Sequence, residues 1–276
     1  MQILVSTGAL IGRPNGRNFR LLKDFKNELN CDGFEFMMYS DFYDKISEII
    51  DFTQSIGLNV PTFHCQKSIG EAISKGGKEN FSDAFDRFEK NAAMAQKMGA
   101  RKLIMHLWDG ITSDRNIKNN IDCYKWLREI ADKNGMDLLI ENVICNTNTP
   151  VEHWNELHDK YKDVHFIFDT KMADFHGQLD LLYIDEYDWL YKEGLLRHFH
   201  VNDYGGGYMD WNNLKVLPIG DGHIDFSKFF AYIKKIGYDD TLTIESTAFD
   251  STGVVNFDML NRQIELLKKE FGKNEA

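Results

Sequence analysis

Six polar side chains lie at or beside the ends of short apolar runs, one to each run. The six residues are His64, His106, Glu141, Asp169, His200 and Glu245. Carboxylates and imidazoles hold divalent cations and transfer protons in enzymes. If each run is a strand of a parallel barrel, the carboxyl ends of the strands open into one mouth, where these side chains converge. A single His or Asp in such a position is usually structural, so the repetition along the chain is what predicts an active site.

Four of the six residues supply three oxygen ligands and one nitrogen ligand: Glu141, Asp169, His200 and Glu245. This set suits one divalent metal ion, with Mn²⁺ or Mg²⁺ expected before Co²⁺ or Zn²⁺. Three neighbouring carboxylates repel one another, and without a cation at least one of them is protonated near neutral pH. The alternative is pairing with protein cations, and only Lys171, two residues after Asp169, is placed by the sequence to do so.

A repeating unit of amphipathic helix, glycine and apolar strand positions these residues. Glycine accepts the left-handed conformation that ends a helix, and one precedes each of five strands: Gly57, Gly99, Gly135, Gly194 and Gly237. Apolar runs at 3–7, 33–38 and 164–169 bring the number of predicted strands to eight. Eight alternating units predict an α/β fold, a single closed (β/α)8 TIM barrel. We expect this domain to span residues 1–276, with 271–276 as a frayed tail.

Three helices are predicted in detail. Thr149 and Glu152 form a capping box around Pro150, which predicts a helix that begins at this proline. Apolar residues recur at helical spacing through 81–98, and the same pattern predicts a last helix at 256–271.

The connection between the seventh and eighth strands departs from the short loops found elsewhere. About twenty residues without clear periodicity are usually functional in a compact domain. Three glycines at 205–207 permit movement, so that Tyr204, Tyr208 and Trp211 could close over a small ligand. The alternative is a packed excursion that fills one end of the barrel.

Composition limits the kind of partner. The 276 residues carry a formal net charge of −11, whereas proteins that bind nucleic acid usually present a basic stripe. No apolar stretch approaches the roughly 18 residues that span a bilayer, and the first residues lack the basic region of a secretion signal. Four cysteines without a C-x-x-C pair predict free thiols in a reducing compartment. We expect a cytoplasmic protein without nucleic-acid or membrane partners, and the sequence leaves a homo-oligomer open.

Five segments carry a resemblance to a known family. They are LLIENV, FIFDT, HFHVND, LPIGDGHIDF and GYDDTLTIES. In order, they resemble the strand-five Glu, strand-six Asp-Thr, strand-seven His and closing segments of the xylose isomerase-like TIM-barrel superfamily. That superfamily groups sugar isomerases and epimerases with AP endonuclease family 2, and the resemblance covers nearly the whole chain. In its ketose epimerases, the positions matched by Glu141, Asp169, His200 and Glu245 bind a single divalent metal ion.

Departures from the family pattern bear on the chemistry. Met172 stands where many members have the His of D-T-x-H, and residues 204–206 stand where the epimerases have an Arg. The endonucleases complete a three-metal cluster with a D-x-H pair in the strand-seven loop, and we expect no counterpart of this pair between Asp203 and Asp225. His64 and His106 match histidines that hold extra zinc ions in those enzymes. We expect one metal ion, with His64 and His106 as substrate contacts or, alternatively, as structural residues.

The resemblance implies a metal-dependent isomerase or epimerase whose partner is a small keto-sugar, polyol or sugar acid. Such an enzyme moves a proton at the carbon next to a carbonyl through a metal-stabilised enediolate. Glu141 and Glu245, from strands far enough apart to bracket a sugar, would be the acid and the base. The candidates for substrate contact are His64, His106, Lys171, Trp108, Glu35 and His176.

Other functions remain open on the same fold. A dehydratase of the inosose or dehydroshikimate type would expel a β-hydroxyl with a general acid, for which His106 or Lys171 could serve. A non-catalytic ligand-binding barrel would keep the metal site without a productive acid–base pair, and the presence of both Glu141 and Glu245 disfavours it. Nuclease activity is disfavoured by the acidic composition and the missing ligands.

Overall fold

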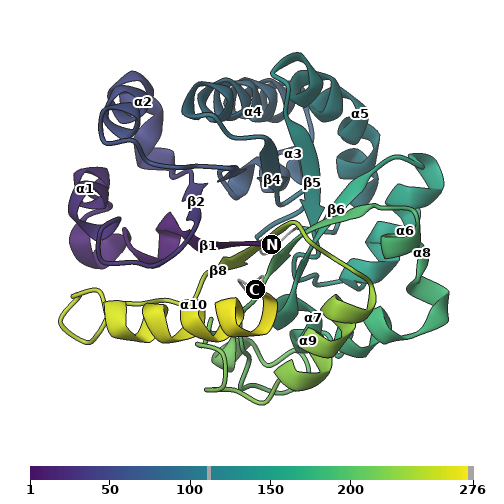
Figure 1. Cartoon of the computed structure of the whole chain (residues 1–276). Helices are drawn as coiled ribbons and strands as arrows, with labels where there is room; N and C mark the ends of the chain where they lie inside the picture. The colour runs from purple at the N-terminus through teal and green to yellow at the C-terminus, as the bar shows by residue number, and fades with distance from the viewer. Residues whose placement is uncertain (111–112, 273–276) are drawn as a thin grey trace.

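The strands close into a barrel in sequence order. In the computed structural model, which describes residues 1–110 and 113–272, each strand is parallel to the next and β8 pairs with β1. The strands are β1 (Gln2–Ser6), β2 (Gly33–Met37), β3 (Thr62–His64), β4 (Lys102–Met105), β5 (Asp137–Glu141), β6 (His165–Asp169), β7 (Leu196–His200) and β8 (Thr241–Ile244). Figure 1 shows them around a central axis with the helices outside. The predicted (β/α)8 TIM barrel is confirmed.

The helices cover the outside of the barrel. They are α1 (Leu22–Phe25), α2 (Ile46–Ser55), α3 (Ser68–Lys75), α4 (Lys78–Met98), α5 (Ile117–Lys133), α6 (Pro150–Lys160), α7 (Thr170–Phe175), α8 (Trp189–Lys192), α9 (Phe226–Lys235) and α10 (Phe257–Phe271). Helix α10 packs on β8 and β1, so the last helix covers the seam where the barrel closes (Figure 1).

The predicted helix boundaries agree with the structure to within a turn. Thr149 Oγ1 accepts from the backbone N–H of Glu152 while the Glu152 carboxylate accepts from the N–H of Thr149, so α6 begins at Pro150 as predicted. Gly99 ends α4 with a positive φ of 86°, and its N–H donates to carbonyls of the last turn. Helix α4 starts at Lys78, one turn before the predicted residue 81.

Side-chain alternation along the strands brings the strand-end residues into the barrel mouth. Successive residues of a strand point to opposite sides of the sheet, so His200 shares its side with His198, and Asp169 shares its side with Ile167. The layer beneath the mouth is divided in two. It is polar around Glu35 and His198 and apolar where three side chains form a separate buried cluster, Ile104, Leu139 and Ile167.

The long connection after β7 is anchored at its base. The carboxylate of Asp203 accepts hydrogen bonds from the backbone N–H groups of residues 204, 220, 222 and 224. Tyr204 is buried, and its hydroxyl donates to the carbonyl of Gly207 at 2.9 Å. The expectation that Tyr204 closes over a ligand is therefore wrong, because Tyr204 is part of the packed base. Tyr208 and Trp211 are 69% and 48% exposed, and a lid role for these two stays a prediction.

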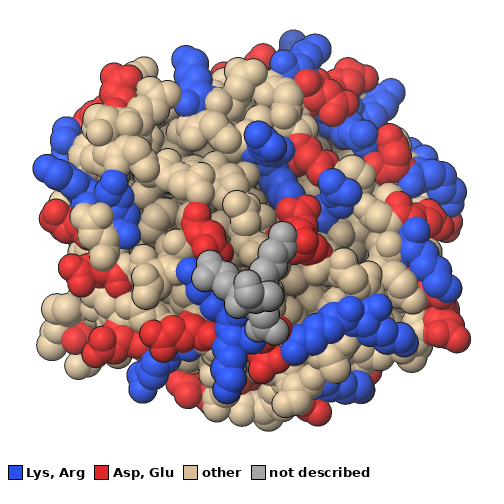
Figure 2. Space-filling model, in the orientation of Figure 1, with Lys and Arg blue, Asp and Glu red and all other residues tan. Residues whose placement is uncertain are grey.

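The surface, the helices and the cysteines bear on the expectations from composition, of which the absence of nucleic-acid and membrane partners stays a prediction. On the face shown in Figure 2, basic and acidic side chains are interspersed. No helix among the described residues is long and apolar enough to cross a membrane. All four cysteines are free thiols, as predicted, and Cys65, Cys123 and Cys145 are buried. Residues 273–276 of the expected tail lie outside the described residues.

Candidate active site

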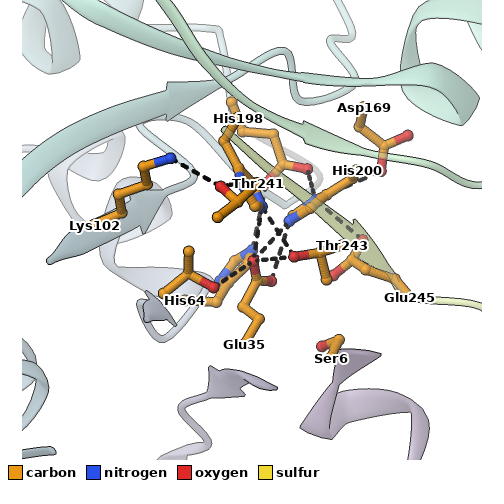
Figure 3. Close-up of polar contacts among 12 residues, drawn as sticks. Ser6, Glu35, His64, Lys102, Asp169, His198, His200, Thr241, Thr243 and Glu245 are labelled. Carbon is orange, nitrogen blue, oxygen red and sulfur yellow. Dashed lines mark hydrogen bonds and ion pairs between the residues drawn. The ribbon is translucent and has the colours of Figure 1, made fainter. Parts of the chain in front are cut away.

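The four expected metal ligands converge at the carboxyl ends of the strands. Glu141, Asp169, His200 and Glu245 each present a ligand atom, and these atoms lie within 4.8 Å of one another. His200 lies between the acids, as Figure 3 shows. Its Nδ1 is 3.0 Å from Glu141 Oε1, 3.2 Å from Glu245 Oε2 and 3.9 Å from Asp169 Oδ2. The sequence prediction that these residues share one site is thus supported by their positions.

The electrostatics of the cluster show how it is balanced without a cation. Burial disfavours a charged imidazole, but the carboxylates of Glu245, Glu35 and Glu141 outweigh it and raise the pKa of His200 well above its ordinary value. Burial, with the charges of Glu141 and Glu245, raises the pKa of Asp169. Burial opposes ionisation of Glu245, but the positive charge of His200 lowers its pKa to about 2. A divalent cation would replace the His200 proton in this balance.

A second group of possible ligands adjoins the first and shares Glu141. Glu141 Oε2 lies 2.8 Å from His106 Nε2 and 3.3 Å from His64 Nε2. All three residues are buried, and these atoms make no well-aligned hydrogen bond within the described part of the chain. Such unsatisfied atoms are costly in a protein interior. Because Glu141 Oε2 and the two imidazole nitrogens face one another, they fit a bound metal ion or a polar group of a substrate.

Two asparagines that the sequence analysis missed orient the carboxylates. The side chain of Asn142 bonds both the N–H and the carbonyl of Asp169. Asn202 donates to Asp169 Oδ2 at 3.1 Å and to Glu245 Oε2 at 3.3 Å, and its oxygen accepts from the N–H of Glu245. Their positions just after β5 and β7 were a signal, since residues at the carboxyl ends of barrel strands lie at the mouth.

Glu35 lies beneath His200 and not on the substrate side of it. Its Oε1 is 3.0 Å from His200 Nε2, and its Oε2 accepts from Thr243 at 3.1 Å and lies 3.2 Å from His198 Nε2. Glu35 is fully buried, and its carboxylate is occupied by these donors and by Thr62 (3.3 Å). Glu35 therefore contacts His200, an expected metal ligand, and does not make the expected substrate contact. A mid-strand Glu gave no sequence signal for this role.

The hydrogen bonds around Glu35 continue through the barrel to its opposite end. His198 Nδ1 faces Thr241 Oγ1, which accepts from the ammonium of Lys102 at 2.8 Å (Figure 3). Burial lowers the pKa of His198 to about 4, so its imidazole is neutral near pH 7. A neutral ring next to the Glu35 carboxylate must carry its proton on Nε2 and accept from Thr241 at Nδ1.

Trp108 and His176, like Glu35, do not make the substrate contacts that were expected from the sequence. Trp108 is fully buried, its Nε1–H donates to the carbonyl of Val143 at 2.8 Å, and its ring packs edge-on against His153. His176 Nε2 accepts from the N–H of Cys145 at 3.0 Å, and burial lowers the pKa of His176 to about 4. Both side chains support the loop after β5, which corrects their assignment to the substrate.

A pocket of about 300 Å³ lies at the mouth beside Glu245. Lys171 and Met172 line it, so the residue that replaces the family histidine is at the predicted place. Lys67, three residues after His64, also lines the pocket and was missed, since loop residues after β3 show no periodic pattern. Burial disfavours its charge, but Glu245 and the carboxylates around it outweigh burial and raise the pKa of Lys67. Glu245 thus borders the pocket from the metal side.

The expectation that no D-x-H pair lies between Asp203 and Asp225 is wrong, because this spacing occurs once, within LPIGDGHIDF, at Asp221-Gly222-His223. His223 Nε2 lies 2.7 Å from Asp174 Oδ2, and its side chain is about half exposed. This histidine is not among the described groups that could share a metal ion with Glu141. The absence of a third metal position next to the cluster stays a prediction.

Comparison with known proteins decides the family. The family described as xylose isomerase-like TIM barrel matches residues 24–269. This chain belongs to that family. The match includes all four expected metal ligands and both lysines of the pocket. No protein of curated function matches the sequence.

Several solved structures share the fold of this chain. A D-tagatose 3-epimerase-like protein aligns with a TM-score of 0.73 at 18% identity, over 98% of this chain and 97% of the other. D-Allulose 3-epimerase from Methylomonas sp. in complex with D-allulose aligns with a TM-score of 0.71 at 15% identity, over 98% and 97%. The IOLI protein with a bound zinc atom gives 0.70 at 14% identity, over 99% and 100%. At these identities the likeness shows the fold.

Proposed function

We propose that this family member is a divalent-metal-dependent isomerase or epimerase of a small keto-sugar, polyol or sugar acid. The observation that carries the proposal is the convergence of Glu141, Asp169, His200 and Glu245 within 4.8 Å at the barrel mouth. The adjoining pocket of about 300 Å³ is large enough for a monosaccharide. Similar structures that carry the names of sugar epimerases, one with D-allulose bound, add support.

The donor set fits one divalent ion. Glu141, Asp169, His200 and Glu245 would hold it, and Mn²⁺ or Mg²⁺ suits three carboxylates, whereas Co²⁺ or Zn²⁺ suits the imidazole as well. The zinc atom in the IOLI structure is consistent with this range. When bound, the ion would polarise the substrate carbonyl and stabilise negative charge on its oxygen.

The two glutamates differ in their access to the substrate. The Glu245 side chain is 10% exposed and lines the pocket, whereas that of Glu141 is fully buried behind it. This exposure supports Glu245 as the group that removes a proton from the substrate carbon next to the carbonyl. Glu141, held by His106 and His200, would exchange the proton on the other side of a bound sugar. Asp169 and His200 act only as ligands in this scheme.

The test is proton exchange at carbon. The metal-loaded protein in D₂O is incubated with a panel of ketoses and ketose acids, and NMR follows deuterium incorporation next to the carbonyl. Exchange with interconversion of epimers or isomers is the expected result. Loss of water from the substrate would instead favour the dehydratase. Binding without exchange across the panel would leave only the ligand-binding barrel.

Paired variants separate proton transfer from metal binding. Glu245→Gln and Glu141→Gln each keep shape and one oxygen but lose the base, so turnover should fall by roughly 10²–10⁴-fold. The two variants should differ in which epimer still exchanges with solvent. Asp169→Asn, as a ligand-only change, should recover part of its activity in excess metal. Glu186→Gln, on an exposed turn, is the matched control. Full activity of metal-loaded Glu245→Gln would rule out the two-base mechanism.

A further inference from the structure

Two cationic side chains line the pocket at the barrel mouth without a partner. Lys171 is only 7% exposed, and Lys67 is partly buried. No hydrogen bond or ion pair joins either ammonium group to any residue that the structure describes, and both side chains face the same space of about 300 Å³. A buried ammonium group without a counter-charge is costly. A pocket that holds two of them is suited to an anion.

The nearby carboxylates are engaged elsewhere. Asp169 accepts from the N–H of Met172 and from Asn202, and Glu245 accepts from Asn202 and contacts His200. Their charges attract the lysines at longer range, since Glu245 raises the pKa of Lys67. A divalent cation bound by these carboxylates would neutralise their negative charge. That charge would then no longer balance the positive charge of the two lysines. The two ammonium groups are then available to the substrate.

The rest of the pocket lining combines apolar and hydroxyl-bearing side chains. Met37, Met172 and Val216 are apolar, whereas Ser6, Tyr39 and Thr247 carry hydroxyl groups. Ser6 Oγ accepts from the N–H of Gly8 at 3.2 Å, and the Tyr39 hydroxyl donates to the carbonyl of Ile11 at 2.9 Å. Hydroxyl groups suit the uncharged part of a sugar, and the two ammonium groups suit a negative charge on the same ligand.

We propose that the substrate carries an anionic group, a carboxylate or a phosphate, and that Lys67 and Lys171 bind this group in the pocket beside Glu245. The inference rests on the proposed function in taking this pocket as the substrate site. It narrows the substrate class from sugars in general to sugar acids or sugar phosphates.

Three ketoses of one carbon skeleton test the charge. D-Fructose, D-fructose 6-phosphate and D-fructuronate are titrated into the metal-loaded protein by calorimetry. At least one of the anions should bind about tenfold or more tightly than D-fructose, because charge-assisted hydrogen bonds contribute more than neutral ones. Its affinity should fall with rising salt. The tighter of the two anions distinguishes phosphate from carboxylate. If neither anion binds more tightly than D-fructose, the proposal is overturned.

Lysine variants test the residues. Lys171→Met and Lys67→Met keep much of the side-chain volume but lose the charge, so each should weaken the tighter anion about tenfold or more and change D-fructose affinity by less than about threefold. Lys215→Met, an exposed change in the long connection after β7, should leave both affinities unchanged. An equal loss for anion and neutral sugar would make the lysines hydroxyl contacts and overturn the proposal. The salt dependence of the unmodified protein provides a test that needs no variant.

The proposed isomerase function and the proposed anion site can each fail independently of the other. Tight anion binding without proton exchange on any substrate would contradict the isomerase and leave the anion site standing. Exchange on neutral ketoses, with no preference for the anions, would support the isomerase and contradict the anion site.

Discussion

At the scale of single residues, Glu35 explains how His200 presents one nitrogen to the metal site. A carboxylate only accepts hydrogen bonds, so His200 Nε2 must carry a proton toward Glu35 at 3.0 Å. With one proton left on the ring, Nδ1 is the ligand atom among the three acids. Removing a carboxylate that holds a ligating histidine in this way typically lowers the metal affinity 10- to 100-fold.

We therefore expect Glu35→Gln to weaken metal binding about 10- to 100-fold, because an amide can no longer accept from both histidines. Competition with a fluorescent chelator measures the dissociation constant, and a melting curve in chelator checks the fold. Thr62→Val is the control, since Thr62 donates a hydrogen bond to Glu35 at 3.3 Å and, within the described part of the chain, makes none to His200. An unchanged affinity in Glu35→Gln would mean that the acids alone orient His200.

Metal stoichiometry decides the role of His64 and His106. We expect about one divalent ion per chain by elemental analysis, and the same value for His64→Asn and His106→Asn, if both histidines contact substrate. A value near two that drops to one in His106→Asn would place a second ion on the group shared with Glu141. A value near three would instead favour nuclease activity, because the endonucleases of the superfamily that the sequence resembles hold a three-metal cluster.

At the scale of elements, one carboxylate organises the loop after β5. Asp114 accepts from the backbone N–H groups of Asn146, Thr147 and Asn148, at 2.9 to 3.0 Å, and from the Thr147 hydroxyl at 2.6 Å. Burial opposes its ionisation, but the hydrogen bonds from Thr147 and the backbone outweigh burial and lower the pKa of Asp114 to about 2. The loop is therefore held by a charge.

A folded-state pKa of about 2, below the ordinary 3.8, means that the Asp114 charge stabilises the fold above that ordinary value. This contribution is lost as the pH falls toward 2. We expect Asp114→Asn to be less stable by about 1–3 kcal/mol at pH 7, and the gap to the unmodified protein to close between about pH 4 and pH 2. Urea unfolding across this range measures it, with exposed Asp221→Asn as control. A gap independent of pH would show that shape, and not charge, holds the loop.

At the scale of the whole molecule, the proposed metal site links the ends of four strands. An ion at about 100 times its dissociation constant should stabilise the fold by about 2.7 kcal/mol through mass action. For a chain of this size that corresponds to a rise in Tm of roughly 5–10 °C. Calorimetric melting with metal and with chelator measures the difference. Equal Tm values would show that His200 and the pocket lysines already compensate the acids without a metal ion.

The sequence by itself determined the barrel and five of the charged residues at its mouth. Continuous apolar strands that alternate with helices commonly form one closed architecture, the parallel barrel. A residue at the carboxyl end of any strand of this barrel lies at its mouth. Glu141, Asp169, His200 and Glu245 could be found for this reason. Lys171 could be found as well, because it follows a strand end by two residues.

Only the tertiary structure decided what each remaining candidate touches. Loop residues follow no period, so the sequence does not specify that Trp108 and His176 turn into the support of the β5 loop or that Lys67 faces the pocket. Glu35 lies mid-strand, and its contact with His200 spans 165 positions of sequence. Such contacts depend on how distant strands are placed by barrel closure, and no local pattern encodes that placement.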